Sequence, residues 1–211
     1  MKTITCYLDF ISPYAYLAFE ALPQALMGTS YRVVYRPILF AALLKHHGQL
    51  GPVEIAGKRE WTYRQVLWQA RQLGVPLQMP AKHPFNPLAL LRLGVACDPQ
   101  GEPSRFVCET VFRHVWRSEG AAPDDVARLA ELTAHLSPHR SPDAPEVKAQ
   151  LKVHTDAAIE TGVFGVPTFD VDGHLFWGLD ALPMLRAYVD GDAWFDGPWV
   201  TAASVAQGVK R

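Results

Sequence analysis

The stretch TITCYLDFISPYAYL, residues 3–17, decides the fold because it joins a strand to a helix within a few residues. Residues 3–10 are rich in β-branched and aromatic side chains, which are typical of a strand. Ser12 followed by Pro13 is an N-cap and first-turn signal, which predicts a helix through about Leu26. The Ser12 hydroxyl should therefore lie among backbone N–H groups that have no partner within the helix. Taken alone, this pair of residues predicts only a helix cap.

The rest of the chain alternates between strand and helix patterns. A second strand, residues 31–36, completes a β-α-β unit with parallel strands and a right-handed crossover. Residues 38–160 are helical in pattern. A strand pair at 168–171 and 175–177 then flanks a tight-turn dipeptide, and a last helix is predicted from Asp180 to about Tyr188. Three apolar stripes mark the central helices: Val107, Cys108, Val111, Phe112 and Val115; Val126, Leu129, Ala130 and Leu136; Val147, Leu151, Ala158 and Ile159.

This order divides one sheet between the two ends of the chain. We predict a discontinuous domain formed by residues 1–37 and 160–195, with residues 38–159 as an all-helical insertion. The last twenty residues carry little pattern, and we expect them to be partly mobile.

Composition narrows the classes of partner. The 211 residues include 20 Lys and Arg against 21 Asp and Glu, so the nearly neutral charge favours neither nucleic acid nor an anionic membrane. Three scattered cysteines form no CxxC and no disulfide framework, and no signal peptide is apparent, so we predict a cytoplasmic protein. His135 and His139 are separated by Pro138, which prevents helical ligand spacing, and no metal site is predicted.

The segment GVFGVPTF, residues 162–169, places a proline directly before a predicted strand. Only about 5% of X-Pro bonds are cis, so Pro167 taken alone would be an ordinary trans loop proline. The loop occurs together with a divided sheet and an opening strand-Ser-Pro-helix segment, and this combination raises the estimate that the bond before Pro167 is cis.

Five blocks of this sequence, taken in order, resemble the glutathione-dependent 2-hydroxychromene-2-carboxylate isomerases, which are close to the kappa class glutathione transferases and to the DsbA-like branch of the thioredoxin superfamily. The blocks are DFISPYAYL at 9–17, GPVEIAGKRE at 51–60, LGVPLQMP at 73–80 with HPFNP at 83–87, GVFGVPTF at 162–169 and FWGLDAL at 176–182. The resemblance implies an α/β thioredoxin-like fold with a large all-helical insertion, of the DsbA and kappa type.

The resemblance also implies a glutathione site. Ser12 stands where a thioredoxin-like oxidoreductase has its attacking cysteine, and Ala15 stands where the second CxxC cysteine would be, which excludes dithiol chemistry. Pro167 would be cis, with the Val166 backbone facing the cysteinyl part of glutathione. Residues matching Gly178, Leu179 and Asp180 hold the γ-glutamyl end; Ala181 replaces an arginine that usually follows them.

Three further positions are implied with less support from the residues themselves. Lys58 matches a lysine that contacts the glycyl carboxylate, and Lys45 matches a lysine near the organic substrate; both could instead be solvated surface lysines. His83 matches an aromatic position on the substrate side, with a changed residue type.

The implied activity is isomerisation of 2-hydroxychromene-2-carboxylate to trans-o-hydroxybenzylidenepyruvate, in aromatic catabolism, by reversible addition of a glutathione thiolate. The implied partners are glutathione as cofactor and a small aromatic substrate, with no membrane or nucleic acid; a homodimer is compatible with the sequence. Two alternatives stay open: a kappa-like glutathione transferase, and a non-catalytic binding protein on the same scaffold.

Overall fold

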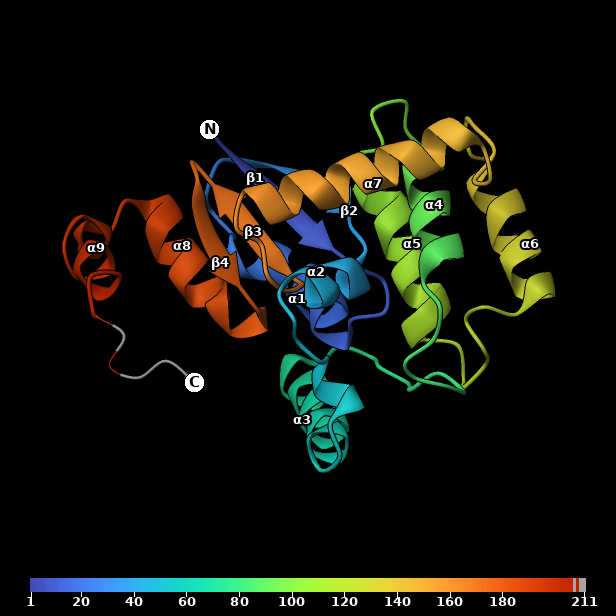
Figure 1. Ribbon diagram of the computed structural model, residues 1–211, viewed down its shortest axis with the longest axis horizontal. Coiled ribbons are helices and arrows are strands. Elements are labelled where there is room, and N and C mark those ends of the chain that lie inside the picture. Colours follow the sequence, from blue (N-terminus) through green and yellow to red (C-terminus); the bar gives the residue numbers. More distant parts are fainter. Residues whose placement is uncertain (207, 209–211) are drawn as a thin grey trace.

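A four-stranded mixed sheet forms the centre of the computed structural model, which describes residues 1–206 and residue 208 (Figure 1). β1 (Lys2–Leu8) pairs in parallel with β2 (Tyr31–Pro37), which confirms the predicted β-α-β unit. β3 (Thr168–Val171) lies antiparallel between β1 and β4 (His174–Trp177), so the order is β2-β1-β3-β4. The two ends of the chain therefore build one sheet, as the sequence predicts.

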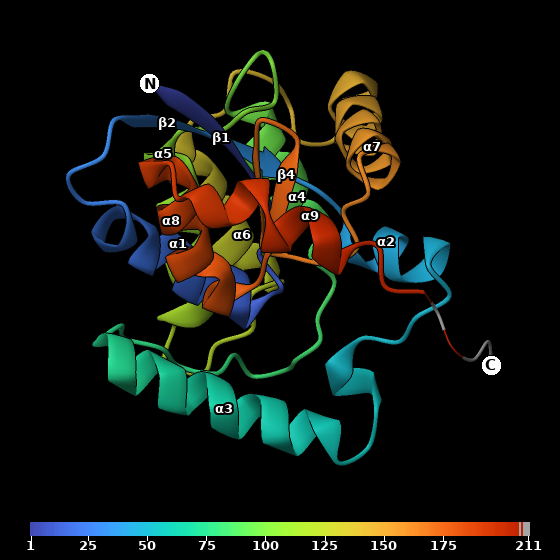
Figure 2. The same ribbon diagram turned by 90° about the vertical axis from the view of Figure 1, so that its left-hand side faces the viewer.

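The helices follow in the predicted order. Those before β3 are α1 (Pro13–Ala25), α2 (Phe40–His46), α3 (Lys58–Leu73), α4 (Leu88–Ala96), α5 (Arg105–Trp116), α6 (Val126–Leu136) and α7 (Pro145–Glu160), with a 3-10 turn, η1, at Pro52–Glu54. After β4 come η2 (Leu179–Ala181), α8 (Leu182–Asp190), η3 (Ala193–Asp196) and α9 (Pro198–Ala202). α3 projects from the body of the molecule (Figures 1 and 2). None of the helices in the described part of the chain has the length and apolarity that a membrane span requires.

Side chains of β1 alternate between two apolar clusters because successive strand residues point to opposite faces of a sheet. Ile4 and Leu8 belong to the larger cluster, which also includes α1, while Tyr7 belongs to a smaller one with Leu43 of α2 and Ala158 of α7. Apolar side chains therefore cover both faces of the sheet. A binding site has to form instead in the loops at the ends of the strands.

The central helices pack directly onto the sheet unit. The rings of Phe112 and Phe10 meet edge to face at 4.9 Å, and the fully buried Trp116 donates its indole N–H to the Phe10 carbonyl oxygen at 3.1 Å. The predicted stripe on α5 is confirmed, because all of its members are buried. One cluster thus spans residues from both predicted domains, and the domain boundaries at 37 and 160 stay a prediction.

The predicted hairpin is confirmed. Asp172 and Gly173 link β3 to β4 with φ values of 52° and 81°, the left-handed conformation that a tight two-residue hairpin requires. This turn fixes the register that places Trp177 and Gly178 beside the strand that follows Pro167.

The predicted stripe on α6 is wrong at two of its members, Val126 and Ala130, which are both exposed. Val126 is 82% exposed, whereas Leu132, which the stripe omitted, is buried. The N-cap of α6 is Asp125, whose side chain accepts from the Arg128 N–H at 3.0 Å. Val126 follows it directly and so lies in the first turn of the helix, exposed to solvent.

Replacing Val126 with lysine is therefore expected to change the free energy of unfolding by no more than about 0.5 kcal/mol, because an exposed side chain loses no packing. Urea unfolding of both proteins measures this. A loss comparable to that of a buried valine would contradict the exposed position.

The last predicted helix begins later than expected. Leu179–Ala181 form a 3-10 turn, and the α-helix starts at Leu182 rather than Asp180. Pro183, which lacks an N–H donor, is readily accommodated in the first turn of an α-helix and marks this start.

Part of the C-terminal segment forms helical turns that the sequence pattern did not predict, and its mobility stays a prediction. The aromatic side chains of Phe195 and Trp199, on η3 and α9, pack against Phe176 of β4 with ring separations of 5.9 and 5.6 Å. These aromatic contacts hold the segment against the sheet, although its sequence shows no helical apolar pattern. The part of that expectation that concerns residues 207 and 209–211 lies outside the described residues.

Candidate functional site

Ser12 is the N-cap of α1, as predicted. Its Oγ accepts from the Ala15 N–H at 3.2 Å, and its backbone carbonyl accepts from the Tyr16 N–H. The next residue, Pro13, has no N–H to offer, so Tyr14 is the first residue that can present a backbone donor at this helix end. The helix dipole makes this end favourable for a negative charge.

The second predicted loop lies directly against Ser12. The Val166–Pro167 peptide bond is cis, as the family resemblance implies. The Ser12 hydroxyl donates to the Val166 carbonyl oxygen at 3.4 Å, although 154 residues separate them. Antiparallel pairing of β1 with β3, with Tyr7 opposite Thr168, brings the two loops together. The bond is long, so the hydroxyl proton is only weakly held and can turn towards another acceptor.

The predicted γ-glutamyl residues continue from the same loop. The Gly178 N–H donates to the Pro167 carbonyl oxygen at 2.9 Å. Gly178 has φ +100°, and a Cβ atom there would lie 2.4 Å from an Asp180 carboxylate oxygen, so only glycine fits. Asp180 is exposed and lies on η2, which packs against α1. Burial raises the pKa of Tyr14 in α1, and the negative charge of Asp180 raises it further.

The two predicted lysines lie on segments around this centre. Lys45 is in the last turn of α2, and Lys58 is the first residue of α3; both are exposed. The end of α2 reaches the proline loop, where His47 Nε2 donates to the Val163 carbonyl oxygen at 3.4 Å. The contacts predicted for the two lysines with glutathione and substrate stay predictions.

His83 contacts the turn that carries Ser12. Its Nε2 donates to the Ile11 carbonyl oxygen at 2.8 Å, and its Nδ1 lies 3.0 Å from the Tyr63 hydroxyl. Burial lowers the pKa of His83, so the ring is neutral at physiological pH, with its proton on Nε2. In this arrangement His83 supports the turn; its contact with a substrate stays a prediction.

Asp9 was missed by the sequence analysis as a site residue. It is fully buried, and its carboxylate accepts from the Ile11 and Phe40 backbone N–H groups at 3.1 and 2.9 Å. An acidic residue at the end of an otherwise apolar strand was the available signal, because such a residue is rarely buried without a specific partner.

The protein's own thiols are poorly suited to redox chemistry. Burial raises the pKa of the Cys6 thiol to about 12 and that of the Cys97 thiol to about 11. Cys108 is fully buried as well. Because the thiolate is the reactive form, these cysteines are poorly suited to act as nucleophiles.

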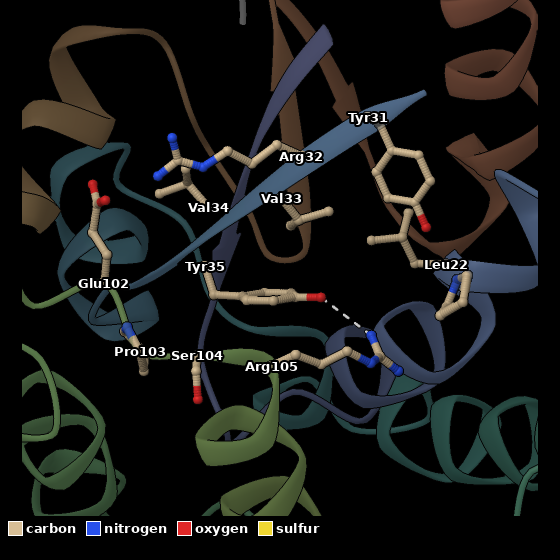
Figure 3. Close-up of a pocket in the computed structure, with 11 residues that line it drawn as sticks. Leu22, Tyr31, Arg32, Val33, Val34, Tyr35, Glu102, Pro103, Ser104 and Arg105 are labelled. Carbon is tan, nitrogen blue, oxygen red and sulfur yellow. Dashed lines mark hydrogen bonds between the residues drawn. The ribbon is translucent and has the colours of Figure 1, made fainter. Parts of the chain in front are cut away.

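A cavity of about 440 Å³ lies elsewhere, along the free edge of β2 (Figure 3). Arg105 donates to the Tyr35 hydroxyl at 3.1 Å within it. None of the predicted site residues lines this cavity, and its size alone supplies no chemistry. The candidate site is therefore the junction of Ser12 with the proline loop.

The fold and this junction define a thioredoxin-like protein with a serine hydroxyl at the start of α1, opposite a cis-proline loop. The chain belongs to the DSBA-like thioredoxin domain family, whose profile matches residues 3–190.

Individual relatives agree with that assignment. The chain is 30% identical to a 2-hydroxychromene-2-carboxylate isomerase of Pseudomonas putida over 188 residues, covering 86% of this chain and 91% of the relative. It is 25% identical to glutathione S-transferase kappa 2 of Caenorhabditis elegans, covering 89% and 92%. A solved structure of a 2-hydroxychromene-2-carboxylate isomerase superposes with a TM-score of 0.77 at 25% identity, covering 93% and 98%. These relatives are isomerases and glutathione transferases, so the chain lies in an enzyme branch of its family.

Proposed function

We propose that this protein is a glutathione-dependent isomerase that interconverts 2-hydroxychromene-2-carboxylate and trans-o-hydroxybenzylidenepyruvate. The observation that carries the proposal is the Ser12 hydroxyl at a helix N-terminus, 3.4 Å from the carbonyl oxygen that precedes a cis-proline. The isomerases at 30% identity support the reaction class. We also propose a cytoplasmic location, which suits a glutathione-dependent enzyme with free cysteines.

Glutathione would lie across the junction described above. The Val166 backbone would pair with its cysteinyl residue, and the sulfur would face Ser12. Asp180 would accept from the γ-glutamyl ammonium, and Lys58 would contact the glycyl carboxylate at the other end. The bonds to charged groups are the stronger ones, so the two ends of the tripeptide fix its position.

The site has to favour a thiolate. A free thiol with a pKa near 8.5 is only slightly ionised at neutral pH, and a decrease of about two units requires about 2.7 kcal/mol. A helix N-terminus supplies about 0.3–1 kcal/mol, and a hydrogen bond to a charged group about 1.5–3 kcal/mol. Ser12 and the start of α1 together reach this amount. Ser12 keeps its own proton throughout and is not the nucleophile.

The ring of the substrate would first open: its ring carbon–oxygen bond breaks, the proton of the 2-hydroxyl passes to the phenolic oxygen, and the carbon that bore both oxygens becomes a ketone conjugated with the double bond. The bound thiolate would then add to the activated carbon of this opened form. A carbon–sulfur bond forms while the electron pair of the double bond moves towards the conjugated carbonyl as an enolate. Rotation follows about what is now a single bond. The enolate then expels the thiolate, which breaks the carbon–sulfur bond and regenerates glutathione. Lys45 would stabilise the substrate carboxylate and the developing enolate.

A kappa-like glutathione transferase is the second candidate, because the Caenorhabditis elegans relative matches over nearly its full length. The same thiolate would serve it, but the carbon–sulfur adduct would be released as the product. The two candidates therefore differ in whether glutathione is consumed.

We expect the purified protein to bind glutathione alone, with saturation in a calorimetric titration and release of a proton as the thiol ionises. S-Methylglutathione, which cannot form a thiolate, is the control and should bind more weakly without proton release. Absence of glutathione binding would remove the proposed function and leave the non-catalytic alternative.

Turnover with limiting glutathione separates the two enzymes. An isomerase should convert many equivalents of 2-hydroxychromene-2-carboxylate per glutathione, because the thiol is regenerated. A transferase stops after one equivalent of electrophile and accumulates a conjugate, which mass spectrometry detects.

A further inference from the structure

Asp9 is a buried carboxylate whose polar contacts are with backbone groups. Its side chain is 0% exposed, and the Ile11 and Phe40 N–H groups donate to its two different oxygens. Its own carbonyl oxygen accepts from the Ser12 N–H at 3.0 Å. Burying a carboxylate without a cation is costly, so its presence requires a reason.

The two bound N–H groups belong to different walls of the candidate site. Ile11 directly precedes Ser12, and the Asp9 contact holds that turn in one conformation. Phe40 is the first residue of α2, the helix that carries Lys45. One carboxylate thus joins the turn bearing the hydroxyl to the helix bearing the predicted substrate lysine.

We propose that Asp9 is a positioning residue: its ionised carboxylate fixes the Ser12 turn against the start of α2, and so holds the Ser12 hydroxyl where it stabilises the bound glutathione sulfur. This inference rests on the proposed function and adds a residue to it. Asp9 acts through Ser12 and does not itself touch the ligand.

The ionised carboxylate is the form that suits these contacts. Two N–H donors approach two oxygens, and a protonated carboxyl or an amide would turn a donor towards one of them. Burial raises the pKa of Asp9 to about 7, and the Phe40 and Ile11 N–H groups oppose that shift. On the other side of the turn, the titratable neighbour is the neutral His83 ring, which donates to the Ile11 carbonyl oxygen. Because a pKa of about 7 puts Asp9 close to the midpoint of its titration at neutral pH, a small change in these hydrogen bonds alters the charge of its carboxyl group.

Stability provides an independent measure of the buried charge. The folded pKa of Asp9 lies above the ordinary aspartate value of 3.8, so its contribution to stability is present below pH 3.8 and is lost as the pH rises through about 7. Asn at this position does not titrate. The difference in Tm, variant minus wild type, should therefore become more positive for Asp9→Asn between pH 4 and pH 8.

The decisive experiment compares Asp9→Asn with Asp125→Asn, a matched control. Asp125 also caps a backbone N–H, but at the start of α6. The ultraviolet absorbance of the bound thiolate gives the pKa of bound glutathione, and calorimetry gives its affinity. We expect Asp9→Asn to raise that thiol pKa and to lower kcat by about 2- to 30-fold, with a smaller effect on affinity, while Asp125→Asn behaves as wild type.

A double-mutant cycle with Ser12→Ala tests whether Asp9 acts through the hydroxyl. If it does, Asp9→Asn changes the thiol pKa much less when Ser12 is already alanine. Additive effects, or an unchanged thiol pKa in Asp9→Asn despite the predicted pH trend in Tm, overturn the inference and leave the proposed function intact. Failure of the wild type to bind glutathione instead overturns both.

Discussion

Replacing Ser12 with alanine is expected to lower turnover with glutathione by about 10- to 150-fold near neutral pH, and to raise the pKa of the bound thiol by about one to two units. The reason is the loss of a hydrogen bond to a charged sulfur, which contributes about 1.5–3 kcal/mol. The N-terminus of α1 still supplies its smaller share of the thiolate stabilisation in the variant, so part of the bound glutathione stays ionised. Stopped-flow turnover and the absorbance of the bound thiolate measure the two effects.

Ser104→Ala is the matched control for this substitution. Ser104 is likewise an N-cap, and its Oγ accepts from the Val107 N–H at 3.3 Å at the start of α5. Both variants lose a helix cap, which costs about 0.5–2 kcal/mol of stability. Only Ser12→Ala should lose activity; equal losses in the two variants would show that the serine serves the fold alone.

Replacing Asp180 with asparagine is expected to weaken glutathione binding by about 10-fold, because the γ-glutamyl ammonium loses its anionic partner. The value lies at the low end of the range for charged hydrogen bonds, since this side chain is exposed and water screens the pair. The substitution keeps the shape that fits against Gly178. The effect should therefore appear in KM and in calorimetric affinity, with kcat nearly unchanged.

Asp190→Asn removes the same charge from the far end of α8, where the carboxylate pairs with Arg186 at 2.6 Å. This control should bind glutathione like the wild type. A similar loss of affinity in both variants would indicate a general field effect, and a fall in kcat for Asp180→Asn would place the carboxylate in the chemical step.

Local features of the fold were predictable from the residues themselves. The Ser12-Pro13 pair marks the start of a helix because a hydroxyl cap and a residue without an N–H both suit that position. Asp172-Gly173 marks the hairpin because both residues tolerate positive φ. The α5 stripe predicts its buried face because helical residues three and four apart share a side. Val126 shows the limit of this kind of prediction. An apolar pattern gives the side of a helix that is buried, but it does not show at which end of the helix no other element packs against that side.

The sequence by itself therefore determined the strand-helix order, the hydroxyl at the helix start and, through its resemblance to known enzymes, the expected cis-proline. Only the tertiary structure decided that Ser12 meets Val166, that Gly178 binds Pro167, and that Asp9 is buried between two segments. These contacts depend on which strands pair and in what register. Pairing of β1 with β3 links residues more than 150 positions apart, and no local preference encodes such a distance.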